Sequence, residues 1–281
     1  MDDYQLTQAQ ITAYGLYLHA EEHAPGTIAK YLRDVGAFAA WLDGRTVTKE
    51  LAAQWKDCLL SSGRKPSTIN SMLAAVNNLF RFLGWGIRVK FLKIQRRLFR
   101  DQSRELTRGE YDLLVDTART AGRERLALLM EAICSTGVRV SEVRYLTVEA
   151  ARQGRAEIAL KGKIRVILLP GRLCRKLLKY AKKQKIASGE IFLTRSGKSL
   201  SRRQIWAEMK AICTAAGVAP EKVYPHNLRH LFARAFYRVS HNIARLADVL
   251  GHSSIETTRI IYLVTTGTEQ IRQLDRLGLV L

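Results

Sequence analysis

The chain has 281 residues, with 46 Lys and Arg against 25 Asp and Glu, and its formal net charge is +21. This length allows one large domain or two smaller ones, and the charge points to a polyanion as partner. The acidic, polar start lacks the pattern of a signal peptide and no apolar run reaches the length of a membrane span, so we expect a cytoplasmic protein.

The positive charge is concentrated in two stretches. Residues 51–100 hold ten basic residues and one acidic residue, and residues 151–200 hold fourteen and two. Two separate basic regions indicate a surface that grips duplex DNA from two sides; a generally basic protein is the simpler alternative. The four cysteines have no C-x-x-C spacing and are most simply buried thiols in a reducing compartment.

Residues 7–85 predict a bundle of four helices. Apolar residues recur at i, i+3, i+4 and i+7, and turn residues such as Asp43-Gly44 separate the runs. Thr48 is placed to cap the third helix and Ser67 to cap the fourth. We therefore expect a helical domain over residues 1–87.

Basic residues lie in the loop before the fourth helix and in the segment after it. The loop R-K-P leads into a helix N-terminus and suits a backbone phosphate, with a merely solvated loop as the alternative. From Arg88 to Arg104 the apolar pattern lapses, so residues 88–104 are interpreted as an extended linker that follows DNA, in preference to a basic amphipathic helix. The residues expected to bind DNA are Arg64, Lys65, Arg88, Lys90, Lys93, Arg96 and Arg97.

A second domain is expected over residues 105–281. Thr107 and Glu110 form a capping box at its start, and the apolar helix that follows ends at Gly137. Two strands then flank the turn K-G-K. The other elements expected are the strands Ala156–Leu160, Ile164–Leu169 and Ile191–Leu193, helices near Leu173–Tyr180 and Ile205–Ile212, the latter capped by Ser201, and a C-terminal interaction helix capped by Thr266 and Glu269. The fold class is thus mainly α with a small β-sheet.

The stretch from Tyr224 to Tyr262 carries the residue types of a phosphoryl-transfer site. It reads Y-P-H-N-L-R-H, then L-G-H-S, then a tyrosine. Arg and His hold a phosphate and stabilise its charge during displacement, and a phenol can form a covalent ester. A zinc hydrolase is the rival, because His226 and His230 have the i, i+4 spacing of H-E-x-x-H. However, Asn227 stands where the catalytic glutamate would be.

These residues resemble the tyrosine recombinase (phage integrase) family. H-x-L-R-H, L-G-H-S and the later tyrosine match its second half. T-G-V-R-V-S-E, from Thr136 to Glu142, supplies the upstream arginine that the family predicts, and L-K-G-K-I-R-V supplies a lysine in a β-hairpin. Four elements in the right order are a strong signal, whereas any one alone would be weak.

The resemblance implies a site-specific DNA strand transferase that works without metal or other cofactor. It implies an N-terminal core-binding domain, a mostly helical α/β catalytic domain, double-stranded DNA as substrate and a homo-oligomer on DNA, a tetramer in the synaptic complex, with accessory proteins possible. The compact two-domain form resembles the Xer-like or mobile-element members. A catalytically silent DNA-binding relative is the alternative within the family.

The resemblance also implies a role for each site residue. Tyr262 would attack a backbone phosphate to give a 3′-phosphotyrosyl link and a free 5′-hydroxyl. The residues that would assist it are Arg139 and Arg229 on the phosphate charge, Lys161 (with Lys163 as the alternative) as acid for the leaving oxygen, His226 in proton transfer at the tyrosine, and His252 on the phosphate.

The spacing before the tyrosine departs from the family's commonest pattern. Tyr262 is the tenth residue after His252, whereas the ninth is the commonest position in the family. One residue on a helix is a rotation of about 100°, so the tyrosine would face away unless the segment bends. No other tyrosine lies between Tyr237 and the end of the sequence, so Tyr262 stays the expected nucleophile.

Overall fold

The computed structural model describes residues 4–94, 102–160, 163–252, 254–262, 271 and 275–276. Its internal contacts divide the chain into two units, Met1–Arg96 and Arg97–Leu281. Most of the C-terminal interaction helix expected to begin near Thr266, including Thr266 and Glu269, lies outside the described residues. Among the helices that are described, none combines the length and apolar character needed to cross a bilayer.

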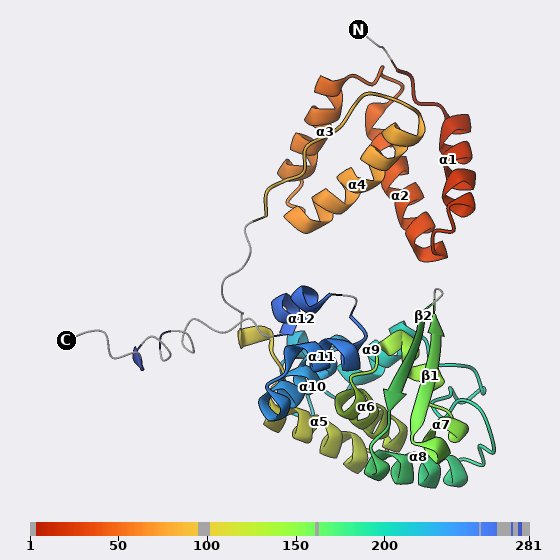
Figure 1. Cartoon of the computed structure of the whole chain (residues 1–281), viewed down its shortest axis with the longest axis vertical. Coiled ribbons are helices and arrows are strands. Elements are labelled where there is room, and N and C mark those ends of the chain that lie inside the picture. Colours follow the sequence, from red (N-terminus) through yellow and green to blue (C-terminus); the bar gives the residue numbers. More distant parts are fainter. Residues whose placement is uncertain are drawn as a thin grey trace. The chain divides into compact units, whose positions relative to one another are not determined.

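The first unit is the expected four-helix bundle (Figure 1). Its core is aromatic, with the Phe38 ring packed edge-on against Trp55 and Phe80. Thr48 caps the third helix as predicted, but the prediction that Ser67 caps the fourth was wrong. That helix begins at Pro66, two residues earlier than a cap at Ser67 would give, because proline at the first helical position has the backbone angle a helix needs and no N–H to satisfy. The helices are α1 (Gln8–Ala20), α2 (Pro25–Leu42), α3 (Lys49–Ser61) and α4 (Pro66–Phe82).

The second unit is mostly helical, as the sequence predicts. Capping boxes at Thr107 and Ser201 open two of its helices where expected. The predicted strand Ile191–Leu193 was wrong, because in this short stretch only Leu193 makes a bridge, an isolated one to Ser199. The helices are η1 (Gln102–Arg104), α5 (Arg108–Thr120), α6 (Glu124–Thr136), η2 (Val140–Tyr145), α7 (Val148–Gln153), α8 (Gly171–Lys183), α9 (Arg202–Lys210), η3 (Pro220–Lys222), α10 (Pro225–Ser240), α11 (Ile243–Leu250) and α12 (Ile255–Tyr262).

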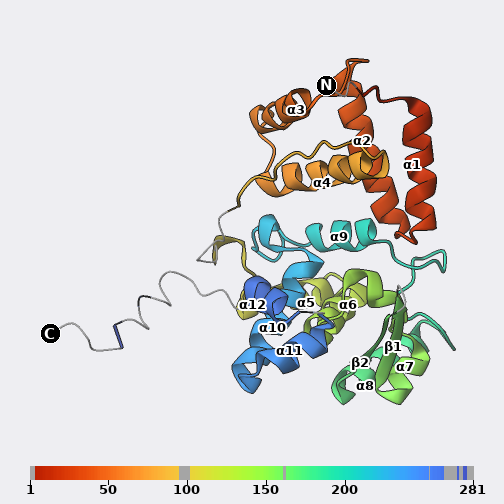
Figure 2. The ribbon, with the colours of Figure 1, turned by 45° about the horizontal axis from the view of Figure 1, so that its top comes forward.

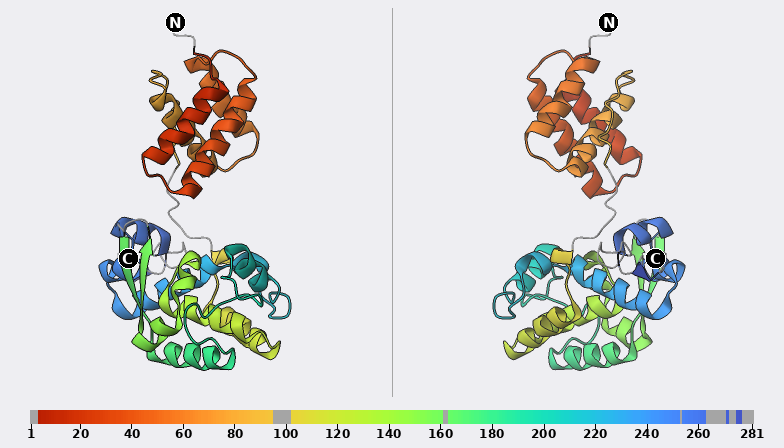
Figure 3. Two further views of the ribbon diagram at one scale, coloured as in Figure 1. Left: turned by 90° about the vertical axis from the view of Figure 1, so that its right-hand side faces the viewer. Right: turned by 90° about the vertical axis from the view of Figure 1, so that its left-hand side faces the viewer.

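The two strands of this unit form one antiparallel hairpin, β1 (Arg155–Leu160) and β2 (Lys163–Leu168). Arg155 pairs with Leu168 at the open end and Leu160 with Lys163 at the turn. Figure 2 shows α7 and α8 beside the hairpin. The central helix α6 packs against α10, and both views of Figure 3 show the blue ribbons of α10, α11 and α12 together. The ends of α6 and α11 thereby lie next to α10.

Candidate active site

The helix α10 presents two residues of the expected site, His226 and Arg229, on one face together with His230. Pro225 occupies its first position, so His226 lies in the first turn, with Arg229 and His230 at i+3 and i+4. The His226 and His230 rings contact edge to face, with centroids 4.5 Å apart. Asn227 turns inward instead, and its amide donates to the backbone carbonyls of Arg104 and Lys222. The same turn of the helix therefore carries site residues and a structural anchor on different sides.

Arg229 is a buried arginine that reaches three parts of the site. Its residue exposure is 2%. The Nε atom donates to the Tyr262 hydroxyl at 3.1 Å, one terminal nitrogen donates to the Gly137 carbonyl, and the other donates to the Leu250 carbonyl at 2.7 Å. Burial is the largest effect on this guanidinium and lowers its pKa from the ordinary value. Neutral carbonyls and a phenol thus hold a buried cation without cancelling its charge.

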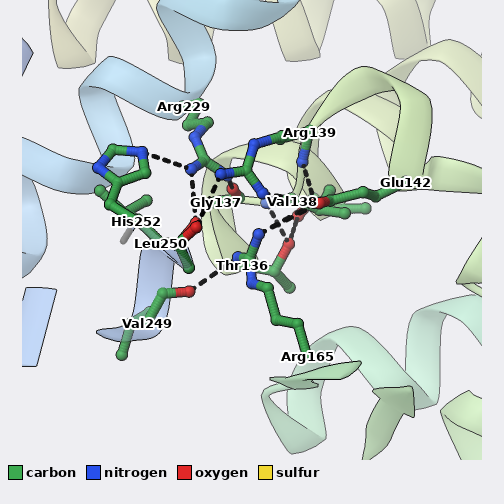
Figure 4. A network of polar contacts seen from close by, with 12 residues as sticks. Thr136, Gly137, Val138, Arg139, Glu142, Arg165, Arg229, Val249, Leu250 and His252 are labelled. Carbon is green, nitrogen blue, oxygen red and sulfur yellow. Dashed lines mark hydrogen bonds and ion pairs between the residues drawn. The ribbon is translucent and has the colours of Figure 1, made fainter. Parts of the chain in front are cut away.

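The C-terminal end of α11 binds three arginines through consecutive carbonyl oxygens (Figure 4). Arg165 donates to the Val249 carbonyl at 2.8 Å, Arg229 donates to that of Leu250 at 2.7 Å, and Arg139 donates to that of Gly251 at 3.0 Å. A helix leaves its last carbonyls without partners and carries partial negative charge there. The helix end therefore attracts the three cations and fixes their spacing.

Glu142 is the carboxylate that balances this cluster. It is buried, and Arg139 donates to it from its backbone amide and from its guanidinium, both at 2.8 Å. Arg165 donates to both of its oxygens at 3.2 and 3.3 Å. Burial would raise the pKa of Glu142, but the hydrogen bonds from Arg139 and the charges of both arginines bring it below its ordinary value. One anion among three cations leaves net positive charge for a phosphate.

His252 connects Arg229 to the helix α12. Its Nε2 lies 3.1 Å from an Arg229 nitrogen, and its Nδ1 lies 2.9 Å from the Thr258 hydroxyl. Because a guanidinium only donates, Nε2 must accept, and we assign the proton of the neutral ring to Nδ1. Burial, followed by the charges of Arg229, Arg139 and Arg165, lowers the pKa of His252 to about 4. The ring is therefore neutral at physiological pH.

Tyr262 faces the site in spite of the ten-residue spacing. Its residue exposure is 1%, and its ring stacks on His252 with centroids 5.6 Å apart and planes inclined by 18°. The His230 centroid lies 4.7 Å from that of Tyr262, closer than His226 at 6.3 Å. Partial desolvation, then the charges of Arg229 and Arg139, lowers the pKa of His226, so this ring is available as a proton acceptor.

These groups open onto one cavity of about 510 Å³. Arg139, His226, Arg229, His252 and Tyr262 all line it. Arg202 and the half-exposed Trp206 of α9 line it as well. No motif in the sequence marked these two, and only the fold brings α9 to the cavity. The cavity combines three guanidinium groups, two imidazoles and a phenol, which is a set of groups that can bind and attack a phosphodiester.

The sequence profile of the phage integrase family matches residues 104–267, and that of the phage integrase N-terminal SAM-like domain matches residues 11–86. The chain belongs to the phage integrase family. A tyrosine recombinase XerC from Roseiflexus castenholzii is 30% identical in an alignment that covers 89% of this chain and 87% of the relative. As a member, this integrase-family chain is a tyrosine site-specific recombinase, as the sequence predicted.

Solved structures share the fold of this integrase-family chain. A XerH recombinase bound to its difH substrate aligns with a TM-score of 0.71 and 19% identity, over 95% of this chain and 84% of that one. A lambda integrase tetramer bound to a Holliday junction aligns with a TM-score of 0.72 and 18% identity, over 92% of this chain and 78% of that one. These likenesses confirm the predicted fold class.

The rival zinc hydrolase finds little support in this phage integrase fold. Among the side chains that the structure describes, no group of three His, Cys, Asp or Glu residues is arranged to hold a metal ion. Asn227, in the glutamate position of the zinc motif, is bonded to backbone carbonyls in the interior. Membership of the phage integrase family favours DNA strand transfer over metal-dependent hydrolysis as the activity.

The expected general acid and part of the DNA-binding set cannot be placed. Lys161, Arg96 and Arg97 lie outside the described residues, and only the backbone of Lys163 is described, at the start of β2. Arg64 and Lys65 are exposed in the loop before α4. The alternative acid, Lys163, therefore stays open beside Lys161.

Arg88, Lys90 and Lys93 lie exposed in an extended segment that follows α4. Asparagine side chains of α4 hold this segment through pairs of hydrogen bonds. Asn77 bonds to both backbone groups of Val89 at 2.9 Å, and Asn70 bonds to those of Leu92 at 2.8 and 2.9 Å. The clamped Val89 is buried and the clamped Leu92 is half-buried, while the basic side chains are exposed.

Proposed function

We propose that Tyr262 is the nucleophile of DNA strand cleavage and that Arg139 and Arg229 hold the scissile phosphate. The hydrogen bond from Arg229 Nε to the Tyr262 hydroxyl, at 3.1 Å, carries this proposal, because it joins the attacking atom to a cation that lines the same cavity. Positive charge beside the oxygen stabilises the negative charge that develops on the nucleophile and on the phosphate.

In this mechanism the tyrosine oxygen forms a bond to phosphorus and the bond to the 5′ oxygen breaks. The products are a 3′-phosphotyrosyl ester and a 5′-hydroxyl, and the ester conserves the bond for rejoining to another strand. His226, which is neutral at physiological pH, takes the phenol proton. Lys161 supplies a proton to the leaving 5′ oxygen.

The arrival of the phosphate changes the part played by His252. In the free protein its Nε2 accepts a hydrogen bond from Arg229. A phosphate anion beside the ring favours the protonated form, in which both nitrogens donate. We propose that His252 then donates from Nε2 to a non-bridging oxygen and keeps its bond to Thr258.

The proposed substrate is double-stranded DNA, bound by a homotetramer in the synaptic complex. The fold shared with a lambda integrase tetramer on a Holliday junction supports this assembly. In the proposal, residues 1–87 form the DNA-binding domain and residues 88–104 the linker, and they bind DNA together with the catalytic domain over residues 105–281. Arg64, Lys65, Arg88, Lys90 and Lys93 contact backbone phosphates.

Adduct formation tests the proposal directly. The unmodified protein is incubated with DNA that carries its recombination site, and the mixture is denatured and separated by size. We expect a covalent protein–DNA adduct, and none from Tyr262→Phe, which lacks only the hydroxyl. Tyr237→Phe, a change in the half-buried tyrosine of α10, is the matched control and keeps the adduct. An adduct that persists in Tyr262→Phe would show that another residue attacks.

A further inference from the structure

Arg165 is a third arginine of the cluster that does not reach the cavity. Arg139 and Arg229 both line the cavity, whereas Arg165 is absent from its wall and its side chain is 12% exposed. Its guanidinium lies between Glu142 and the end of α11 (Figure 4). Since it cannot touch a phosphate bound in the cavity, any part that it plays in the reaction must pass through its neighbours.

One neighbour is the carboxylate that orients Arg139. Glu142 Oε1 accepts from Arg139 at 2.8 Å and from Arg165 at 3.3 Å, and Oε2 accepts from Arg165 at 3.2 Å. The carboxylate is thus held from two sides. Without Arg165 only Arg139 would hold it, and the pair could rotate together.

The other neighbour is the turn that follows α11. Gly251 has φ +62°, and a Cβ there would lie 2.5 Å from Cδ and 2.7 Å from Nε of Arg165. The turn therefore packs directly on the arginine side chain. The carbonyl of the same Gly251 accepts from Arg139 at 3.0 Å. Arg165 thus touches both groups that bind the Arg139 guanidinium.

The local chemistry argues against a purely structural role. The Nε of Arg165 is buried and has no hydrogen-bond partner among the described residues. Burial, together with the charges of Arg229 and Arg139, lowers the pKa of Arg165 to about 10, in spite of Glu142. An apolar side chain of similar volume would fill this space without a lone buried donor or a buried charge. The positive charge of Arg165 is instead explained by the two groups that it contacts, Glu142 and the turn at Gly251.

We propose that Arg165 is a positioning residue for strand cleavage, which fixes Glu142 and the turn at Gly251 and so aligns the Arg139 guanidinium with the scissile phosphate. This inference rests on the proposed function of the cavity. It predicts a defect in the chemical step rather than in DNA binding, because Arg165 lies behind the cavity wall.

The first measurement is single-turnover cleavage at saturating DNA, with the DNA dissociation constant measured in parallel. We expect Arg165→Met to slow cleavage by about ten- to a hundred-fold, the cost of a misplaced catalytic group, with DNA affinity nearly unchanged. Arg165→Lys keeps one cationic donor and recovers part of the rate. Arg155→Met, at an exposed arginine on the neighbouring strand, is the matched control and cleaves normally.

A substrate with a methylphosphonate at the scissile position separates positioning from general loss of structure. Its linkage lacks the charge on one non-bridging oxygen, so cleavage depends less on the Arg139 clamp. The rate loss in Arg165→Met should shrink on this substrate, and so should that in Arg139→Ala. Misfolding would slow both substrates alike. If Arg165→Met does not fold, as judged by its thermal transition, the same comparison is made with Arg165→Lys.

Three results would overturn the inference. One is cleavage by Arg165→Met at the unmodified rate, and another is an equal loss on both substrates in a folded variant. The third is a double variant in which the rate losses of Arg165→Met and Glu142→Gln multiply. Multiplied losses would mean that the two residues act independently, which contradicts a path from Arg165 through Glu142. If the unmodified protein forms no adduct, the proposed function fails instead, so the two failures are distinct.

Discussion

In the free protein, His252 donates from Nδ1 to the Thr258 hydroxyl at 2.9 Å. Thr258 is fully buried and lies one helical turn before Tyr262 on α12. The helix that carries the phenol is therefore joined to the imidazole that contacts Arg229. This hydrogen bond joins His252 to the helix that carries Tyr262, ten positions later in the sequence. It also leaves Nε2 as the His252 nitrogen that faces Arg229.

Removing this link should slow cleavage. In Thr258→Val the shape is nearly kept but the acceptor for Nδ1 is lost, so the other ring tautomer becomes accessible. We expect a loss of about three- to ten-fold in the single-turnover rate, which corresponds to one net hydrogen bond. Nitrogen-15 NMR of the histidine rings reports the tautomer directly. Thr257→Val, at the exposed neighbouring position, should change neither observable.

Protein stability should fall as the pH is lowered below the ordinary pKa of the half-buried His252. The pKa of His252 is about 4 in the folded protein, against an ordinary value of 6.5. Between these values the unfolded chain binds the proton and the folded chain does not, so acid favours unfolding. The free energy of unfolding, from urea titrations, should decrease from about pH 6.5 to pH 4. His252→Gln should make the decrease shallower; an unchanged slope would count against the assigned burial.

The proposed general acid has a chemical test. In Lys161→Ala the 5′ oxygen leaves without a proton, so cleavage of normal DNA should be severely slowed. A bridging sulfur at that position is a leaving group of much lower pKa that needs little protonation. Cleavage of the sulfur substrate by Lys161→Ala should therefore approach that of the unmodified protein. Arg139→Ala and Arg229→Ala should remain defective on it, because they act on the phosphate charge.

Lys163 provides the internal control for this experiment. It is the first residue of β2 and the alternative acid of the hairpin. If Lys161 is the acid, Lys163→Ala should cleave normal DNA at a rate close to that of the unmodified protein. Sulfur rescue of Lys163→Ala, with Lys161→Ala inactive on both substrates, would assign the acid to Lys163.

The sequence was most informative where short motifs carry chemistry and least informative where distant segments meet. Arg229 and Tyr262 were identifiable because their neighbours along the chain have characteristic types and spacing. The contacts of Arg165 with Glu142 and Val249 join residues from three separate elements, and no local pattern encodes them. Trp206 was missed for the same reason, since an aromatic residue on an amphipathic helix is ordinarily part of a core.

The spacing of the tyrosine also required the structure. A rotation of about 100° per residue describes one continuous helix, but the ten residues after His252 do not form one. The helix α12 begins only at Ile255, so the helical rotation applies from Ile255 onward and not from His252. The Thr258 contact then fixes this register. A count of residues does not give the position at which the helix starts. The sequence alone therefore could not predict the direction in which the phenol points.

The basic segment after α4 should contribute phosphate contacts that are sensitive to salt. Arg88 and Lys90 lie exposed on either side of the clamped Val89, so both cations face outward from a fixed backbone. Each phosphate contact adds roughly 0.9 to the slope of log affinity against log salt. The double variant Arg88→Gln/Lys90→Gln should lower that slope by about two on specific and nonspecific DNA alike. Lys49→Gln, at an exposed lysine of α3 outside the proposed DNA-binding set, should leave the slope unchanged; equal slopes for both variants would remove this segment from the interface.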